Sequence, residues 1–350
     1  MGVRQAGSFQ AMGDMLSKRR ATLRDVAKRS GVSVATVSRV LNSPLQVSVT
    51  TRERVQAAID QLRFFPSPAA RAINSGRTRL IGALVPTLDN AIFARFLDAL
   101  QATLATRDLS LVVATTEGDP EAEAVKAQNL VECGAEGLVV SGLRRAEAFY
   151  VLVERAQVAV VATSFFDPGY KFPTIGYDNN RVSQTALEHL TTLGHRRIAV
   201  LHGPVENNDR TAARLSGLTL SSGLALSFHE TELSVRGACA ATAGLQDDLD
   251  SVTAILCLSD VLAMGALFEL RRRGRIVPDE ISVIGIDDLP SSEFVEPPLT
   301  TVRLEVSRMG ETTGGAMADW IERGDMPSAL HLDGELVVRQ TTAPPSRPDR

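Results

Sequence analysis

The sequence predicts a small all-α N-terminal head of the helix-turn-helix kind, followed by a larger α/β body in which parallel sheets carry helices on both faces. Two observations lead to this fold class. Between residues 22 and 62, apolar side chains recur every three to four residues in three short segments, which is the spacing of amphipathic helices. Beyond residue 78, short β-rich apolar runs alternate with helical segments, which is typical of parallel sheets covered on both faces.

The head begins with two short helices joined at Gly31, which permits a sharp turn because glycine tolerates positive φ. Thr22 and Ser33 are expected to cap them, since a hydroxyl can accept a free backbone N–H. The first helix turns Leu23, Val26 and Ala27 inward, and the second turns Val37, Val40 and Leu41 inward. The outer side of the second helix, with its cap, then carries small or polar residues and one arginine: Ser33, Val34, Ala35, Thr36, Ser38 and Arg39.

A third helix is expected to open at Thr50-Thr51-Arg52-Glu53, which has the pattern of a capping box. Its apolar positions are Val55, Ala58, Ile59 and Leu62. Three such helices can close a small core and leave the second helix free to enter a DNA major groove. The pattern alone leaves a purely structural helix pair equally open.

Charge favours the DNA-binding interpretation of the head. Residues 1–79 hold 14 basic and 4 acidic side chains, a net charge of +10, whereas residues 80–350 hold 23 basic and 37 acidic ones, a net charge of −14. A basic head on an acidic body is typical of a module that faces phosphate.

Two segments flank the head. Residues 1–20 are polar, end in Lys18-Arg19-Arg20, and are expected to form a disordered tail that either touches phosphate or has no role. In residues 65–77, Ser67 and Pro68 can start a helix of about two turns that Gly76 ends. Helices this short are marginal in water, so this hinge helix should form only when something packs on it, and a plain linker is the alternative.

The body is expected to contain a buried strand at residues 80–86, a second strand at 109–114, and further apolar strands at 137–140, 158–162, 198–201, 254–258 and 281–286. Ligands of such sheets bind beyond the carboxyl ends of the strands. This rule selects Asp89-Asn90 with Phe93, Thr163-Ser164, Ser259-Asp260 and Asp287-Asp288. Asn90, Asp178 and Asp260 also stand where helices begin, so helix capping is an alternative explanation for them.

Composition argues against several other classes of protein. No apolar run approaches the roughly 18 residues of a membrane span, and no signal-peptide core opens the chain. Cys133, Cys239 and Cys257 form no CxxC pair, which indicates reduced thiols and a cytoplasmic protein without metal or cofactor. Phosphate-loop, HExxH and paired-cysteine motifs of enzymes are missing, and His195 is interpreted as a turn residue after Gly194.

The chain resembles the lactose-repressor (LacI-type) family of bacterial transcription regulators from about Thr22 to Ala343. In the head the likeness rests on Leu23-Arg24-Asp25-Val26-Ala27, Gly31-Val32-Ser33, Thr36-Val37-Ser38-Arg39-Val40-Leu41-Asn42 and Thr51-Arg52-Glu53-Arg54-Val55. In the body it rests on Ile81-Gly82-Ala83-Leu84-Val85-Pro86, Leu193-Gly194-His195-Arg196-Arg197-Ile198-Ala199, Ile284-Gly285-Ile286-Asp287-Asp288, Pro298-Leu299-Thr300-Thr301-Val302 and Val338-Arg339-Gln340-Thr341-Thr342-Ala343-Pro344-Pro345.

The resemblance implies a homodimer, with a tetramer possible, that binds a pseudo-palindromic double-stranded DNA operator. Val34 and Ala35 match the family's main specificity positions, and Arg39 matches a base-contacting position where an arginine can pair with guanine. Thr36 and Ser38 are expected to meet phosphate. The hinge helices would enter the minor groove with Ala72 and Ile73, where the family usually has leucine at the wedge and Ile73 is stiffer at χ1.

The same resemblance implies a two-lobed body of the type I periplasmic-binding-protein kind. Its N-lobe would span about residues 78–178 plus 305–331, its C-lobe about 179–304 plus 332–343, with a tail at 346–350. A small-molecule effector would lie between the lobes, and the effector residues expected from the family's positions and the strand ends are Asn90, Phe93, Arg214, Ser259, Asp260 and Asp287.

The effector is expected to be a small sugar acid or a neutral sugar. Leu45-Gln46-Val47-Ser48 and the arginines among the candidates resemble the gluconate-type branch of the family. The aromatic residue that many relatives use for stacking should precede Gly237, but Glu232-Leu233 stands there instead. A regulator controlled by a protein partner remains an alternative. An extracytoplasmic solute-binding protein would share the body but would lack the basic head.

Overall fold

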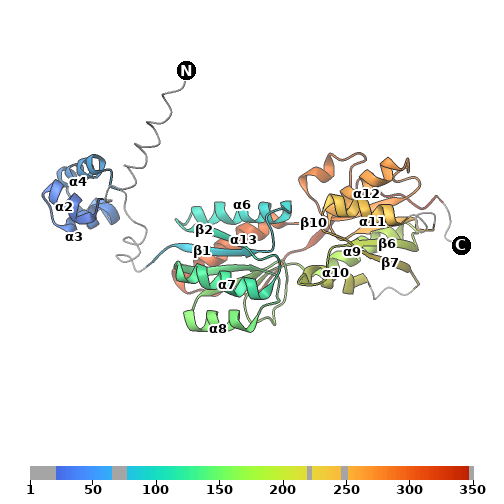
Figure 1. Cartoon of the computed structure of the whole chain (residues 1–350), viewed down its shortest axis with the longest axis horizontal. Coiled ribbons are helices and arrows are strands. Elements are labelled where there is room, and N and C mark those ends of the chain that lie inside the picture. The colour runs from blue at the N-terminus through green and yellow to red at the C-terminus, as the bar shows by residue number, and fades with distance from the viewer. Residues whose placement is uncertain (1–20, 65–76, 219–222, 246–250, 347–350) are drawn as a thin grey trace, which may run out of the picture. The chain divides into compact units, whose positions relative to one another are not determined.

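We describe the fold from a computed structural model, which describes residues 21–64, 77–218, 223–245 and 251–346 (Figure 1). The predicted N-terminal tail, the hinge helix with Ala72 and Ile73, and the last four residues lie outside these ranges. The chain divides into two compact units, one up to Thr78 and the other from Arg79 onward.

The first unit is the predicted three-helix head. Its elements are α2 (Leu23–Ser30), α3 (Val34–Asn42), the 3-10 turn η1 (Pro44–Gln46) and α4 (Val49–Leu62). Thr22 and Asp25 form a reciprocal capping box on α2, Gly31 ends that helix with φ 68°, and the Ser33 side chain caps α3. These local hydrogen bonds confirm the predicted helix ends.

The start of the third helix differs from the expectation. Ser48, not a residue of the Thr50-Thr51 pair, is the cap of α4, and its hydroxyl accepts the Thr51 N–H. The helix therefore begins two residues earlier than predicted, because a good cap precedes the apparent capping box. Its buried side chains Val55, Ala58 and Ile59 join Val26 and Val37 in one apolar core.

The body contains two six-stranded sheets (Figure 1). The first has the order β11-β5-β4-β3-β1-β2 and the second the order β12-β10-β9-β8-β6-β7. The first sheet consists of β1 (Leu80–Val85), β2 (Ser110–Thr115), β3 (Ala135–Ser141), β4 (Ala159–Thr163), β5 (Thr174–Gly176) and β11 (Leu330–His331). The second consists of β6 (Arg197–His202), β7 (Ala225–Glu230), β8 (Ala254–Cys257), β9 (Ser282–Asp287), β10 (Thr300–Leu304) and β12 (Gly334–Val337).

The strand pairing is parallel with one exception. β12 runs antiparallel to β10 at the edge of the second sheet. β10 leads out of this sheet to α13 and β11 of the first lobe, and β12 leads the chain back, so the two strands run in opposite directions. The prediction of parallel sheets is confirmed for the other pairs.

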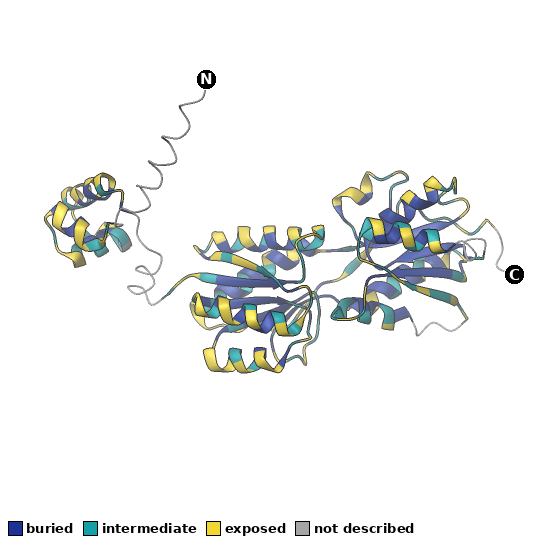
Figure 2. Cartoon of the chain, in the orientation of Figure 1, coloured by how far each residue is buried: buried dark blue, intermediate teal, exposed yellow. Residues whose placement is uncertain are grey.

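Helices cover both faces of each sheet, and the central strands β1, β3, β4, β6, β8, β9 and β10 are among the most buried parts of the body (Figure 2). The first sheet lies between α6 (Ala91–Ala105) with α13 (Val306–Arg323) and α7 (Pro120–Glu132) with α8 (Glu147–Ala156). The second lies between α9 (Asn179–Thr192) with α10 (Asp209–Leu218) and α11 (Val235–Gly244) with α12 (Asp260–Arg272). A short turn, η2 (Pro290–Glu293), follows β9. Among the described residues, none of the helices is both long and apolar enough to cross a membrane.

The two sheets define two lobes, and the chain passes between them three times. It leaves the first sheet after β5, returns to the first lobe after β10, and crosses again between β11 and β12. We call the part built on the first sheet the N-lobe and the part built on the second sheet the C-lobe. The carboxyl ends of β1, β3, β4, β6, β8 and β9 all lead into loops that line one cavity.

Candidate functional site

The outer face of α3 presents the residues predicted to read DNA. Val34 is 41% exposed, and Ala35 and Arg39 are exposed as well. Ser33 and Thr36 hydroxyls lie 2.9 Å apart, and the Ser33 hydroxyl also accepts the Thr36 N–H. Ser38 is half-buried. The two hydroxyls at the start of the helix therefore hold its first turn, and Val34, Ala35 and Arg39 remain accessible.

Two side-chain hydrogen bonds join α2 and α4, the helices on which α3 packs. Arg54 on α4 donates to the Ser30 carbonyl at 2.6 Å, beside the Gly31 turn that leads into α3. Arg29 on α2 donates to the Gln61 side chain at 2.9 Å. Residues 21–64 carry seven basic and three acidic side chains, so the described head is itself positively charged.

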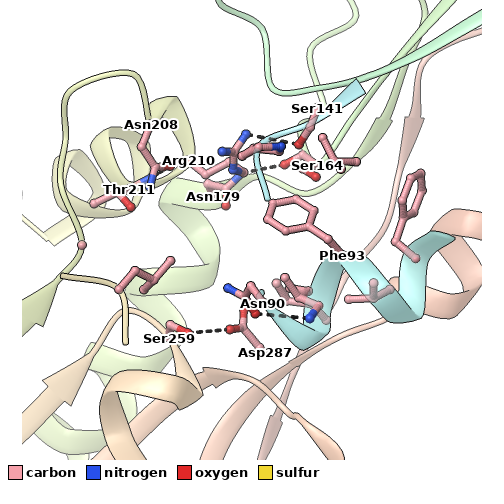
Figure 3. A pocket seen from close by; sticks show the side chains of 18 of the residues that line it. Asn90, Phe93, Ser141, Ser164, Asn179, Asn208, Arg210, Thr211, Ser259 and Asp287 are labelled. Atoms are coloured by element: carbon pink, nitrogen blue, oxygen red, sulfur yellow. Dashed lines mark hydrogen bonds between the residues drawn. The ribbon is translucent and has the colours of Figure 1, made fainter. Parts of the chain in front are cut away.

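The body has a cavity between the two lobes that encloses about 920 Å³, part of it open to solvent (Figure 3). Asn90 and Phe93 reach it from the loop after β1 and from α6, and Ser141 and Ser164 from the ends of β3 and β4. The C-lobe lines it with residues that follow β6, β8 and β9, including Asn208, Arg210, Thr211, Arg214, Ser259 and Asp287. The cavity thus lies where the strand-end rule places a ligand.

Arg214 is the centre of a buried polar network in this cavity. Its guanidinium donates to the Leu258 carbonyl at 2.6 Å and to the Asn179 side chain at 3.1 Å. It also lies 3.7 Å from the Asp287 carboxylate. The Arg214 side chain is only 11% exposed, and its three partners together fix its orientation.

Asp287 is buried and incompletely paired. One carboxylate oxygen accepts the Ser259 hydroxyl at 2.9 Å, while the other, Oδ1, accepts no hydrogen bond from any described residue. Burial raises the pKa of Asp287 to about 7, and the nearby Arg214 opposes that rise. The buried Tyr177 hydroxyl, which also lines the cavity, likewise lacks a partner, and burial raises its pKa.

Arg210 supplies the second positive charge. Its guanidinium lies 3.2 Å from the Asp209 carboxylate and donates to the Ser141 hydroxyl at 3.3 Å. Burial lowers its pKa, and Asp209 opposes this effect. Asp209 also accepts the N–H groups of Leu143 and Arg144 in the N-lobe, at 2.6 and 3.2 Å. Each cavity arginine therefore faces a carboxylate, so the lining carries little net charge.

Five of the six predicted effector residues line the cavity: Asn90, Phe93, Arg214, Ser259 and Asp287. Asn90 and Ser259 also cap α6 and α12, so capping and cavity lining coexist in these residues. Leu233, noted where an aromatic residue was expected, lines the cavity too.

Asp260 is the residue that the structure does not bring to the cavity. Its carboxylate accepts the Leu289 N–H and the hydroxyls of Ser292 and Thr301, at 2.9, 2.6 and 2.6 Å. It therefore ties η2 and β10 to the start of α12, which is a structural role. The neighbouring Ser259, not Asp260, caps the helix.

Several lining residues were not selected from the sequence. The structure adds Ser141, Tyr177, Asn179, Asn208, Arg210 and Thr211, whereas Thr163 and Ser164, which the strand-end rule did select, line the cavity as well. A signal for some of them was present, because the polar Asn207-Asn208-Asp209-Arg210 run follows the predicted strand at 198–201.

His195 also has a different role from the predicted one. It is 1% exposed and connects the Thr253 hydroxyl to the Ala343 carbonyl, both at 2.9 Å. It is a buried anchor for the C-terminal segment and not only a turn residue, because its ring joins Thr253, just before the central strand β8, to Ala343.

Both units of the chain match known protein families. Residues 22–67 match the family described as bacterial regulatory proteins, lacI family, and residues 187–342 match a periplasmic binding protein-like domain. The chain is 34% identical over 337 residues to the HTH-type transcriptional regulator MalR of Streptomyces coelicolor, covering 92% of this chain and 96% of the relative. It is 29% identical over 329 residues to the HTH-type transcriptional repressor CytR of Escherichia coli, with the same coverage.

Among solved structures, the chain is similar to the lac repressor dimer bound to operator and the anti-inducer ONPF. The TM-score is 0.83 at 27% identity, covering 93% of this chain and 100% of that one. The curated relatives named above are regulators and not enzymes. The predicted resemblance is thereby confirmed, and the chain belongs to the lacI family of bacterial regulatory proteins, the DNA-binding transcription regulators.

Proposed function

We propose that this protein is a cytoplasmic homodimeric repressor whose affinity for a pseudo-palindromic operator is controlled by a neutral sugar bound between its lobes. The observation that carries the effector part is a pair of buried polar atoms in the cavity, Asp287 Oδ1 and the Tyr177 hydroxyl, that form no hydrogen bond with any described residue. A buried polar atom without a partner is costly, and the hydroxyls of a sugar can pair with both.

The charge of the cavity favours a neutral sugar over the sugar acid that the sequence placed first. Arg210 faces Asp209 and Arg214 faces Asp287, so neither arginine is left over for a ligand carboxylate. Phe93 offers an apolar surface at the cavity mouth for the carbon face of a ring (Figure 3). A related regulator, CelR, has been solved in complex with cellobiose, at 28% identity and a TM-score of 0.65.

Operator recognition belongs to α3. In this proposal Val34, Ala35 and Arg39 contact base edges in the major groove, and Ser33, Thr36 and Ser38 approach phosphates. Ala72 and Ile73, outside the described residues, would contact the minor groove. The lac repressor structure is that of a dimer on its operator, which supports the same arrangement here.

A C-lobe surface supports the homodimer. Phe268 on α12 is 51% exposed and Phe294, directly after η2, is 81% exposed. The Ser291 hydroxyl lies 3.6 Å from the Met264 sulfur, so α12 and η2 are neighbours. Large exposed aromatic residues on adjacent elements are typical of a surface that a second subunit covers.

The DNA-binding part is tested by in vitro selection of an operator from random duplexes, followed by fluorescence anisotropy. Arg39→Ala should weaken binding to the selected operator by about 10-fold or more, since a bidentate arginine contact contributes about 1–3 kcal/mol. Arg155→Ala, at an exposed arginine of α8, is the matched control and should bind as the wild type does. Unchanged binding by Arg39→Ala would show that α3 is not the recognition helix.

The effector part is tested by a thermal-shift screen of cellobiose, D-ribose, D-gluconate and nucleosides, with calorimetry on each compound that stabilises the protein. A true ligand raises stability by RT ln(1 + [L]/Kd). Binding of a neutral sugar supports the proposal, and binding of gluconate alone would return the sugar acid to first place. The absence of binding across the panel would favour control by a protein partner.

A further inference from the structure

We propose that Asp288 is a positioning residue for effector binding: gripped by Arg303 and Arg339, it holds the turn that directs Asp287 into the cavity. The role in effector binding rests on the proposed function. The placement of Asp287 itself does not, and the two can be tested separately.

The turn has an unusual backbone. Asp287 has φ 125° and Asp288 has φ 52°, so two consecutive residues with side chains lie in the left-handed region. L residues rarely adopt such values, and they persist where the surrounding structure enforces them. Some contact must therefore hold this turn against relaxation.

The Asp288 carboxylate provides that contact. Its side chain is 10% exposed, and its two oxygens are held separately: Arg303 Nε lies 2.7 Å from Oδ2, and Arg339 Nη2 lies 2.8 Å from Oδ1. Charge-assisted hydrogen bonds to both oxygens fix the rotation of a carboxylate as well as its position.

Both arginines are anchored elsewhere, so they can act as a fixed support. Arg303, on β10, also lies 3.3 Å from Glu335 of the antiparallel strand β12. Arg339 donates to the Leu299 carbonyl at 2.8 Å, and its backbone N–H donates to the Thr300 hydroxyl at 2.9 Å. The two guanidinium groups that hold Asp288 are thus fixed at the edge of the second sheet.

The two neighbouring aspartates have divided roles. Asp288 points away from the cavity to the arginines, while Asp287 lines the cavity and accepts the Ser259 hydroxyl. Because one peptide joins them, releasing Asp288 lets the turn rotate and carries Asp287 with it. The Asp288 carbonyl accepts Arg95 of the N-lobe at 3.2 Å, so the other lobe also holds this turn.

The buried position of Asp287 supplies a readout that needs no ligand. The titratable groups around it are Arg214 on α10, Asp260 on α12 and Tyr177 after β5. Burial raises its pKa to about 7. If the turn relaxes and Asp287 reaches solvent, that pKa should fall toward about 4, the ordinary aspartate value.

The experiment is a carboxyl-carbon NMR titration of the full-length protein, with the Asp287 signal identified by its loss in Asp287→Asn. We compare Asp288→Ala, which loses both the grip and the tolerance of positive φ, with Asp288→Asn, which keeps that tolerance. Asp287 should titrate near 7 in the wild type, lower in Asp288→Asn and nearest 4 in Asp288→Ala. Should Asp288→Ala fail to fold, Asp288→Asn alone decides the question.

Asp319→Ala is the matched control. Asp319 also contacts two arginines, Arg107 and Arg323, but it lies within α13 and does not line the cavity. It should leave the Asp287 titration unchanged. Wild-type titration of Asp287 in folded Asp288→Ala or Asp288→Asn would overturn the proposal.

Effector affinity is the second measurement, made by calorimetry with whichever panel sugar binds the wild type. We expect Asp288→Ala to lose 10-fold or more in affinity and Asp319→Ala to lose none. Unchanged affinity in a variant whose Asp287 titration has moved would overturn the link to the effector. If no sugar binds the wild type, the proposed effector fails, and the titration alone still decides whether Asp288 positions Asp287.

Discussion

At the scale of single residues, the cavity is defined by which polar atoms are already paired. Arg214 and Asp260 each have three partners, whereas Asp287 Oδ1 and the Tyr177 hydroxyl accept or donate no hydrogen bond among the described residues, and Oδ1 has only the Arg214 guanidinium at 3.7 Å. Paired groups hold the structure together, and the unpaired ones are available to a ligand. This distinction separates Asp287 from Asp260, although Asp287 ends β9 and Asp260 follows β8, the strand next to it.

The raised pKa of Asp287 makes effector affinity depend on pH. A sugar hydroxyl donates to the ionised carboxylate, so calorimetric affinity for a neutral sugar should rise as pH increases from 6 to 8 through the pKa of about 7. Asp287→Asn should bind more weakly and lose this dependence. A pH dependence that persists in Asp287→Asn would assign it to another group.

The same pKa shift makes stability depend on pH. The pKa of Asp287 is higher in the folded than in the unfolded protein, so the folded state binds this proton more tightly. The stabilisation from the protonated carboxyl group is therefore complete below about pH 4 and is lost as the pH rises through 7. The urea concentration at the unfolding midpoint should therefore decrease as the pH is raised from 5 to 8. In Asp287→Asn this decrease should be smaller. Glu123, whose pKa burial also raises to about 7 despite Arg145 at 3.0 Å, contributes with the same sign, so some slope should remain.

At the scale of elements, close helix packing depends on glycines at particular positions. A Cβ on Gly310 of α13 would lie 2.5 Å from the Phe96 carbonyl of α6, and one on Gly314 would lie 2.9 Å from the Thr103 side chain. The adjacent Gly315 has nothing within 4 Å of such a Cβ. The same helix, α13, thus contains glycines that pack against α6 and a glycine, Gly315, that packs against nothing within 4 Å.

Gly310→Ala should lower the free energy of unfolding by about 1–3 kcal/mol, because the α6 backbone cannot give way to the added methyl group. Gly315→Ala should raise it by up to about 1 kcal/mol, since alanine favours the helix and meets no neighbour. Urea denaturation followed by circular dichroism measures both. Equal effects of the two changes would show that α13 does not pack on α6 in this way.

At the scale of the body as a whole, the two lobes contact each other where N-lobe glycines leave room for C-lobe atoms. The Asp209 carboxylate of the C-lobe accepts N–H groups of the N-lobe loop at Leu143 and Arg144, and a Cβ on Gly142 would lie 2.6 Å from it. A Cβ on Gly118 would lie 2.8 Å from the Asn207 carbonyl. Asn208 and Arg210, which alternate with Asn207 and Asp209 along the chain, line the cavity. The cavity lining and the contact between the lobes therefore share one short segment, residues 207–210.

Gly142→Ala should keep the lobes apart and lower sugar affinity by about 10-fold or more. Gly274→Ala is the matched control, because φ is 70° at Gly274 and 78° at Gly142, but nothing lies within 4 Å of a Cβ at Gly274. Both variants pay the left-handed backbone penalty, and only Gly142→Ala obstructs the lobes. Small-angle scattering should show the separation of the lobes, and calorimetry the loss of sugar affinity, in Gly142→Ala alone. Identical behaviour of the two variants would argue against a contact between the lobes at Gly142.

The subunit surface can be tested in the same manner. Phe294→Asp should shift sedimentation equilibrium from dimer to monomer and weaken operator binding, because a charge would be buried against the partner. Val151→Asp changes another exposed apolar side chain, on α8, and should remain dimeric. A dimeric Phe294→Asp would place the subunit contact elsewhere.

The sequence by itself determined the local elements and the family. Thr22, Ser33 and Gly31 act through hydrogen bonds and φ angles within four residues, so the head helices were predictable, and the apolar runs of the buried strands stand out in the same way. The two-residue error at Ser48 arose where two caps compete. The strand-end rule selected six residues that line the cavity, because parallel strands bring their carboxyl ends together: Asn90, Phe93, Thr163, Ser164, Ser259 and Asp287. Arg214 came from the family resemblance.

Only the tertiary structure decided which of those side chains face the cavity. Asn179 and Arg210 come from segments that periodicity does not mark, and Asp260 turns away because three donors from η2 and β10 capture its carboxylate. The antiparallel β12, the burial of His195 and the grip on Asp288 likewise depend on partners tens of residues or more away. Contacts at that separation form only when the chain is folded, so no local pattern encodes them.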